Sequence, residues 1–286
     1  MDTRNEIREF LTSRRARITP EQAGLPSFSS RRRVTGLRRE EVAMLAGVSV
    51  DYYTRLERGN LNGVSEQVLD AIARALELDD TERAHLFNLA RAENLPHRSR
   101  KSAPASAIKP SVQAILDALV LAPAYVRNAR LDVLAVNDLG KALFPHVFDH
   151  SDGQPNLARA QFLDARSRSF FIEYEKMTND CVALLRAAAG RDPFDRGLTD
   201  LIGELSTRSD EFRVKWAAHN VRMHRSGRKL FHHPSVGDLE LNYEALRISV
   251  DEELFMMVYT APLGSPSHER LQLLASLAAT PVSTER

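Results

Sequence analysis

The residues best suited to do chemistry are a run of arginines near the start of the chain. Between residues 14 and 39 there are eight arginines and a single acidic residue, Glu21, a local charge of +7. Guanidinium groups at this density favour a surface that binds phosphate, as in the backbone of a nucleic acid. A solvated basic face is the alternative. The helices predicted beside the run favour nucleic-acid binding.

Two short helices joined by a glycine turn are predicted between Arg38 and Gly59. Gly47 turns the chain, because a positive φ costs glycine little, and Ser49 is placed to cap the second helix. The first helix has an apolar face at helical spacing, made by Val42, Ala43, Leu45 and Ala46. The second directs Tyr53 and Leu56 inward and leaves on its outer surface Val50, Asp51, Tyr52, Thr54, Arg55 and Arg58.

A helix is also predicted before this pair, because Ile7, Phe10 and Leu11 share one face at helical spacing. Arg14 falls on the same face, and an arginine that points inward needs an acidic partner. Glu57, near the end of the second motif helix, is the expected partner. Such a pair would tie the first helix to the motif in a purely structural role.

Two further helices complete the first domain. Ser65 is placed to cap the fourth helix, and Asp79 with Glu82 has the spacing of a capping box that begins the fifth. Five helices predict a compact all-α domain over residues 1–95. The proline, serine and basic residues of 96–110 are typical of a linker.

Residues 111–280 change character, because strands now alternate with helices. The predicted elements, in order, are a helix at 112–120, a hairpin of 124–128 with 131–137, a long helix whose stripe runs from Phe170 to Ala188, a helix around 198–205, a short helix with Phe212 and Trp216, a hairpin of 228–234 with 239–250, a central strand at 254–261 and a helix at 266–278.

The last hairpin has an irregular pattern. Its second arm alternates from Leu239 to Ala245 and resumes one residue out of phase at Leu246, which predicts a bulge. The next strand is apolar on both faces and should lie at the centre of the sheet. Antiparallel strands with helices packed on one face define an α+β domain.

Composition bounds the class of protein. At 286 residues the chain is long enough for about two domains, with 43% hydrophobic and 27% charged residues. No apolar run approaches the roughly 18 residues of a membrane span, and the charged start has no signal-peptide core, so a cytoplasmic location without a membrane partner is expected. The single cysteine, Cys181, lies in an apolar helical stripe and is interpreted as a buried thiol.

The residue pattern gives little support to an enzyme. There is no phosphate-binding glycine loop and no nucleophile elbow. His219 and His224 are five residues apart, which is wrong for one helix face, and the adjacent His232 and His233 point to opposite sides of a strand. We therefore predict no catalytic residue, no metal site and no cofactor. A metal-dependent enzyme remains a remote alternative, which bound zinc on purification would revive.

Several motifs resemble a known family. The A-x-x-A-G-V-S core and the closing L-E-R-G resemble the helix-turn-helix of XRE-family, phage-repressor-like regulators. From Phe10 onward nearly all of the chain resembles MmyB-like regulators, which join such a domain to a PAS-like sensor domain. In the second half the resemblance rests on PAYVRNARLDVLAVN, LIGELSTRSDEF, WAAHNV, HHPSVGDLELNYE and APLGSPSHERLQLLASLA. Val136 stands where family members often have a tryptophan.

The resemblance implies a transcription factor whose second motif helix enters the major groove of DNA. Base contacts are expected from Val50, Asp51 and Arg55, because valine can touch a thymine methyl, aspartate can accept from a cytosine amino group and arginine can bind guanine through two hydrogen bonds. For Asp51, a first-turn acid that serves the helix dipole is an equal alternative.

Other residues are expected to contact the DNA backbone. They are Arg31, Arg32, Arg33, Arg38, Arg39, Ser49, Tyr52 and Arg58. The first three lie in a predicted loop and would hold phosphates or enter a minor groove; a disordered solubilising loop is the alternative. Because one module has a small footprint, a homodimer on two half-sites of double-stranded DNA about 34 Å apart is the economical prediction.

The resemblance also implies that the PAS-like domain holds a fatty-acyl or other apolar effector. The pocket residues expected are Tyr125, Phe144, Phe162, Phe170, Tyr174, Arg213, Trp216, His219 and Tyr243. Aromatic side chains could wall an apolar cavity, and Arg213, His219 and Arg222 are candidates for binding a carboxylate. Ordinary core packing is the alternative for each aromatic residue. At the level of function, the alternative is a ligand-free platform for dimerisation or for a protein partner.

Overall fold

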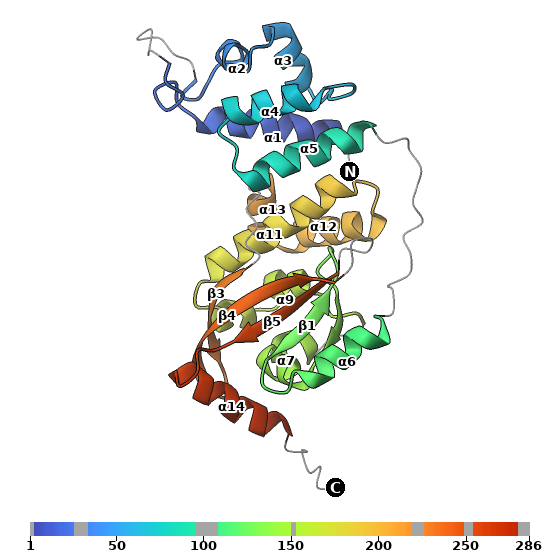
Figure 1. Cartoon of the computed structure of the whole chain (residues 1–286), viewed down its shortest axis with the longest axis vertical. Helices are drawn as coiled ribbons and strands as arrows, with labels where there is room; N and C mark the ends of the chain where they lie inside the picture. Colours follow the sequence, from blue (N-terminus) through green and yellow to red (C-terminus); the bar gives the residue numbers. More distant parts are fainter. Residues whose placement is uncertain are drawn as a thin grey trace. The chain divides into compact units, whose positions relative to one another are not determined.

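The computed structural model describes residues 3–25, 34–94, 108–149, 153–218, 226–248 and 254–279. The chain forms two compact units, and Figure 1 labels most of their elements. Unit 1 comprises residues 1–102, 186–200 and 214–223; unit 2 comprises 103–185, 201–213 and 224–286. The predicted linker at 96–110 falls where the chain passes from the first unit to the second. Two later segments, which the sequence analysis placed in the second domain, are grouped with unit 1.

The amino-terminal part of unit 1 is all helical. Its helices are α1 (Thr3–Arg17), α2 (Arg39–Leu45), α3 (Val50–Glu57), α4 (Glu66–Ala75) and α5 (Asp80–Asn94). The predicted inner face of α1 is confirmed, because Ile7, Phe10 and Leu11 are fully buried. Both predicted caps are present: Ser65 Oγ accepts from the Val68 amide at 3.3 Å, and Asp79 and Glu82 exchange reciprocal side-chain to backbone hydrogen bonds.

The expected partner of Arg14 is wrong. Arg14 is 2% exposed, but its Nε lies 3.1 Å from Oε1 of Glu82 on α5. Glu57 instead receives Arg15, the next residue along α1, with Nε 2.5 Å from Oε1. One residue turns a helix by about 100°. The face of α1 that carries Arg14 therefore packs against α5, and the face that carries Arg15 packs against α3.

The later segments of unit 1 contribute to its core. Arg186, in α11 (Tyr174–Arg191), is fully buried and forms an ion pair with Glu6. Its guanidinium lies 4.2 Å above the centre of the Trp216 ring, in α13 (Asp210–Ala217). Ala187 belongs to the same hydrophobic cluster as the helices of the amino-terminal part. The carboxylate of Glu6 and the aromatic ring of Trp216 compensate the buried charge of Arg186, which explains how this arginine is accommodated in a core.

Unit 2 is built on one antiparallel sheet in the order β2-β1-β5-β4-β3. The strands are β1 (Ala124–Arg127), β2 (Val133–Val136), β3 (Ser226–His233), β4 (Gly237–Arg247) and β5 (Phe255–Thr260). Both predicted hairpins are confirmed. The apolar strand predicted for the centre is β5, which pairs with β1 on one side and β4 on the other.

Helices of unit 2 pack on both faces of the sheet, so the expectation of a single covered face is wrong. The additional helices are α6 (Pro110–Ala118), α7 (Asp138–Leu143), α8 (Pro145–Phe148), α9 (Leu157–Leu163), α10 (Arg166–Phe170), α14 (Pro266–Ala279) and, from residue 201 onward, α12 (Arg196–Arg208). Val126 and Met256 pack with Leu116 of α6 on one face. Tyr125 and Met257, one residue along each strand, lie in the larger cluster on the other face.

Two local predictions in unit 2 are also wrong. The register of β4 with β5 is continuous through Ala245 and Leu246, so the predicted bulge is absent. Leu246 occupies one of the outward positions of the alternating strand and is 52% exposed. The predicted long helix is interrupted after Phe170, and α11 begins only at Tyr174. Phe171 forms a β-bridge with Phe231, and this pairing with β3 draws the backbone out of the helical path.

Candidate nucleic-acid interface and ligand pocket

The turn between α2 and α3 has the geometry that its sequence predicts. Gly47 has a φ of +65°, and the Val48 amide donates to the Ala43 carbonyl at 2.9 Å. Ser49 caps α3, because its Oγ accepts from the Tyr52 amide at 3.1 Å. On α2 the predicted apolar face is confirmed except at Leu45, which is 38% exposed because it lies at the edge of the buried face.

The outer face of α3 presents the three predicted base-contact residues together. Val50 is 46% exposed, and Asp51 and Arg55 are also exposed. The guanidinium of Arg55 lies 5.2 Å from the centre of the Tyr52 ring, one turn earlier on the helix. An exposed valine, carboxylate and guanidinium on one helix face have the apolar, accepting and donating groups that base edges in a major groove require.

The opposite face of α3 is held by a buried carboxylate. Glu57 is 1% exposed and accepts from Arg15 and Arg39, which approach it from α1 and from the first turn of α2. Tyr53 and Leu56 are fully buried beside it. Because three helices meet at one carboxylate, the outer face of α3 is rigidly oriented relative to the remainder of the motif.

The residues predicted to contact the DNA backbone differ in their exposure and in their ion pairs. Arg58 is exposed just after α3, whereas Tyr52 is half-buried. Arg38 binds Glu40, and Arg39 binds Glu57 while keeping half of its side chain exposed. Residues 31–33, the three arginines of the predicted basic loop, lie outside the described residues. The sequence missed the structural role of Arg39, since nothing in the local spacing shows that Glu57 lies within reach.

Four residues expected in a ligand pocket lie in one aromatic cluster on the inner face of the sheet. The rings of Tyr125 and Phe144 are 5.8 Å apart, those of Phe144 and Phe170 are 6.0 Å apart, and Tyr243 lies 6.2 Å from Tyr259. Each of the four predicted residues is less than a tenth exposed. In this structure they form closely packed core, and neither of the two cavities described below is lined by them.

The other expected pocket residues are dispersed. Phe162 packs against Phe212 at 5.1 Å, and the Tyr174 hydroxyl donates to the Gln161 carbonyl at 3.3 Å. Arg213 is exposed and pairs with Asp210, and Trp216 belongs to unit 1. His219 lies outside the described residues. Tyr174 also packs against the aromatic cluster as a partly buried neighbour. The structure therefore brings together five of these residues, and of the described ones it leaves Phe162, Arg213 and Trp216 apart from them.

A half-buried amine on the same sheet face was not predicted. Lys229 Nζ lies 4.6 Å from the centre of the Tyr243 ring and 3.5 Å from the Tyr259 hydroxyl. Burial lowers the pKa of Lys229 to about 8 and raises the pKa of the nearby Cys181 thiol to about 12. The sequence did carry a signal for this position: Lys229 is two residues from the buried Phe231 on β3, so alternation places both side chains on the same face of the strand. Cys181 is buried, as predicted.

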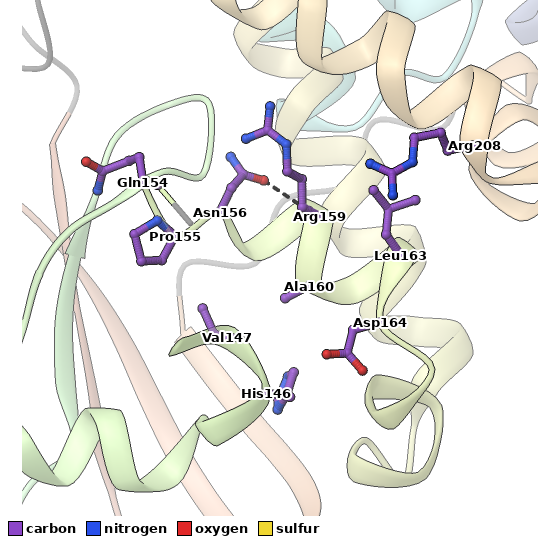
Figure 2. Close-up of a pocket in the computed structure, with 11 residues that line it drawn as sticks. His146, Val147, Gln154, Pro155, Asn156, Arg159, Ala160, Leu163, Asp164 and Arg208 are labelled. Atoms are coloured by element: carbon purple, nitrogen blue, oxygen red, sulfur yellow. Dashed lines mark hydrogen bonds between the residues drawn. The ribbon is translucent and has the colours of Figure 1, made fainter. Parts of the chain in front are cut away.

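A cavity of about 410 Å³ lies in unit 2, and Figure 2 shows the residues that line it. Its lining comes from α8, the segment 153–156, α9 and the end of α12, with the side chains His146, Val147, Asn156, Arg159, Ala160, Leu163, Asp164 and Arg208 among them. A second cavity, of about 510 Å³, lies among α6, α7 and α14. The sequence analysis singled out none of the residues that line the first cavity, because this lining is assembled from short segments without a shared spacing. Of the second cavity's lining it had noted only Val136.

Asn156 and His146 anchor the lining of the first cavity. Asn156 caps α9 by accepting from the Ala158 and Arg159 amides, both at 3.0 Å, so its side-chain oxygen is used structurally (Figure 2). His146 is 7% exposed and packs 4.6 Å from the Phe170 ring. Burial lowers the pKa of His146 to about 4, so its imidazole is neutral at pH 7.

We expect this histidine to make the stability of unit 2 depend on pH. With a pKa of about 4 in the folded chain and 6.5 unfolded, the unfolded state binds more protons between these values. The contribution of the neutral imidazole is therefore complete above pH 6.5 and is lost as the pH falls towards 4. Scanning calorimetry should show a loss of about 2 kcal/mol between pH 7.5 and pH 5 that His146→Phe abolishes.

His232→Phe, which replaces an exposed histidine on β3, controls for the loss of an imidazole elsewhere. If His146→Phe and the wild type lose the same stability between the two pH values, His146 is not the group responsible.

Among the described residues, no group of three or more histidine, cysteine, aspartate or glutamate side chains is arranged to hold a metal ion. None of the helices in the described ranges combines the length and the apolar character that crossing a membrane requires.

The fold and the outer face of α3 define a helix-turn-helix protein with a second, α+β domain. Residues 7–86 match the family described as helix-turn-helix domain, and residues 108–274 match the MmyB-like transcription regulator ligand binding domain. The chain belongs to the MmyB-like transcription regulator family. No protein of curated function matches it. These families indicate a DNA-binding transcription regulator rather than an enzyme.

Proposed function

We propose that this protein is a sequence-specific, XRE-type transcription regulator that reads DNA with α3 and is controlled by a small molecule in its PAS-like carboxy-terminal domain. The observation that carries the proposal is the outer face of α3, where Val50, Asp51 and Arg55 are exposed together above a helix fixed by Glu57. A rigid helix with an exposed, chemically mixed face is suited to reading base edges in a major groove.

The remaining features of the proposal follow from the size of the module. A single helix covers few base pairs, so we propose a homodimer on two half-sites about 34 Å apart. Arg38, Arg39, Ser49, Tyr52 and Arg58 would lie against the flanking phosphates, with Arg31, Arg32 and Arg33 extending the contact. We also propose a cytoplasmic location for this regulator.

Arg55→Ala should weaken binding to the specific DNA site by about 1–3 kcal/mol and relax the preference at one base pair. The guanidinium is exposed on α3, and its only described contacts are the Tyr52 ring and the Asn62 carbonyl, so the fold does not depend on it. Fluorescence anisotropy with a set of single-base-pair variants of the site measures both effects.

Arg58→Ala is the matched control, because Arg58 is exposed at the end of the same helix but is expected to contact phosphate. It should weaken binding to all sequences alike and reduce the slope of log affinity against log salt by about 1. A uniform loss for Arg55→Ala would contradict its role in reading a base.

Selection of binding sites from random duplex DNA, with the full-length protein at near-physiological salt, tests the proposed function directly. We expect a motif with two-fold symmetry. Salt-sensitive binding that yields no motif, both alone and with a cell extract of small molecules added, would contradict sequence-specific regulation.

A second function for the carboxy-terminal domain is a ligand-free platform for dimerisation or a protein partner. The close packing of Tyr125, Phe144 and Phe170 favours it, since a fatty-acyl-like ligand on the inner face of the sheet would have to displace these rings. Mass spectrometry of small molecules released from the purified protein distinguishes the two functions. A stoichiometric compound supports the effector, and a stable dimer without one supports the platform.

A further inference from the structure

One end of the cavity in Figure 2 has an excess of positive charge. Two arginines share a single carboxylate: Arg159 Nε lies 2.8 Å from Oε2 of Glu204, and Arg208 Nη1 lies 2.7 Å from Oε1. Both arginines line the cavity and are about half exposed. Because one carboxylate compensates only one guanidinium, one positive charge remains at this end. The Nη groups of Arg159 make no hydrogen bond within the described part of the chain and are available to an anion.

The other end of the cavity has the opposite excess. Here two carboxylates share one guanidinium: Arg166 binds Asp164 at 2.7 Å and Asp149 at 3.0 Å. Asp164 lines the cavity and lies beside the neutral His146, away from the two arginines in Figure 2. Hydrogen bonds from Arg166 hold the pKa of Asp164 below its usual value, so the carboxylate stays ionised at neutral pH. One negative charge remains at this end.

The wall between the two charged ends is largely apolar. Val147, Ala160 and Leu163 face the cavity from α8 and α9. In addition, the buried Nδ1 of His146 has no hydrogen-bond partner among the described residues. Buried polar atoms without a partner are rare in folded proteins and often mark a site that a bound group completes. A volume of about 410 Å³ lies within the range of small-molecule sites.

We propose that this cavity binds a small zwitterion, with its carboxylate at Arg159 and Arg208, its ammonium group at Asp164, and an apolar spacer along Val147 and Leu163. The inference rests on the proposed ligand control of the carboxy-terminal domain and names the chemical class of the effector. A fatty-acyl chain lacks the cation that the aspartate end would bind. A purely cationic ligand leaves the arginine end without an anion.

Isothermal titration of the full-length protein with linear ω-amino acids of three to eight carbons tests the proposal. The affinity should pass through an optimum in this series, at the length that spans both ends. The matched controls lack one charge each: the alkanoate of the same length has no ammonium group, and the alkylamine has no carboxylate. We expect both to bind at least about tenfold more weakly than the best amino acid, which is the loss of one charge-assisted hydrogen bond.

Substitutions then test which end of the cavity binds the carboxylate of the amino acid. Arg208→Met should weaken the best amino acid about tenfold and leave the alkylamine unchanged, because it removes the excess cation only. Arg228→Met is the matched control, since Arg228 is similarly exposed on β3 and is paired with its own carboxylate, Glu240. Glu204→Gln should strengthen binding of the amino acid, because it frees a second guanidinium charge at the same end.

The proposal is overturned if no member of the series binds at 10 mM (roughly the weak limit of specific recognition), if the singly charged analogues bind as tightly as the amino acids, or if Arg208→Met binds like the wild type. DNA binding is measured on the same preparations without any amino acid. Zwitterion binding by a protein that selects no DNA motif would contradict the proposed function but not this site. A selected DNA motif without zwitterion binding would contradict only this site.

Discussion

Glu82→Ala should lower the free energy of unfolding of unit 1 by about 3–5 kcal/mol. Glu82 is 1% exposed, and its Oε1 lies 3.1 Å from Nε of Arg14, which is 2% exposed. It also accepts from Arg17 at 3.0 and 3.2 Å and from the Asp79 amide. The substitution removes the carboxylate opposite a buried guanidinium and half of the capping box of α5, whereas the alanine gains no comparable contact.

The single tryptophan of the chain gives a readout for this unit, because Trp216 lies in unit 1. Urea unfolding followed by its fluorescence should show a lower midpoint for Glu82→Ala. Glu40→Ala is the matched control: Glu40 also pairs with an arginine but is mostly exposed, so its loss should cost less than about 1 kcal/mol. Equal midpoints for the two variants would show that the buried pair is not stabilising.

Gly59→Ala should be comparably destabilising, by about 3–5 kcal/mol, for a reason of backbone geometry. Gly59 ends the motif at a φ of +93°, a region that residues with a Cβ avoid. A Cβ there would lie within 2.8 Å of the Arg4 Cα and carbonyl carbon, and closer still to its oxygen. Because the obstacle is backbone, either α1 or the end of α3 must move.

Gly63→Ala separates the cost of the positive φ from the cost of the close contact with Arg4. Gly63 also has a positive φ, +71°, but a Cβ there meets nothing within 4 Å. This variant should lose only the conformational cost, about 1–2 kcal/mol. The same tryptophan fluorescence measures both variants, and DNA binding of Gly59→Ala should fall with the folded fraction. If the two variants lost equal stability, the close approach of Arg4 would carry no cost.

The parts of the fold that could be predicted from the sequence depend on local chemistry. Gly47 and Ser49 specify their turn and cap within a few residues, and Asp79 with Glu82 specifies a helix start. Alternation along β4 and the two-sided apolar strand β5 depend only on spacing along one segment. The position of β5 in the middle of the sheet followed from the same pattern, because a strand apolar on both faces needs cover on both.

The main errors involve contacts between segments distant in the sequence. Arg14 was correctly predicted to be buried, but only the packing of α1 between α3 and α5 selects Glu82 over Glu57. The periodicity of 170–188 did not show that Phe171 would pair with Phe231, sixty residues later. The second face of the sheet is covered because Leu116 of α6 packs against Val126 and Met256. The sequence of one segment alone does not reveal this contact.

The candidate DNA-binding face and the cavity in unit 2 also differ in how far they depend on contacts between distant segments. The outer face of α3 is one helix, so Val50, Asp51 and Arg55 could be predicted together from their spacing. The cavity at α8 and α9 is lined from four separate segments, and its charge arrangement depends on how Arg159 and Arg208 share Glu204. Phe144 and Phe170 were predicted to line a pocket because they are large and apolar. Large apolar side chains also fill a packed core, and composition does not distinguish the two roles.

The order of strands has a consequence for biosynthesis. β5 is the last strand to leave the ribosome, yet it separates β1 from β4. Until it emerges, the β1–β2 and β3–β4 hairpins have no strand to join them, and a hairpin alone is marginally stable in water. The sheet therefore closes only after β5 has emerged, long after α1–α5 have left the ribosome. During that interval β1 and β4 each present an unpaired edge, which makes the nascent chain most vulnerable to aggregation and to chaperone capture at this stage.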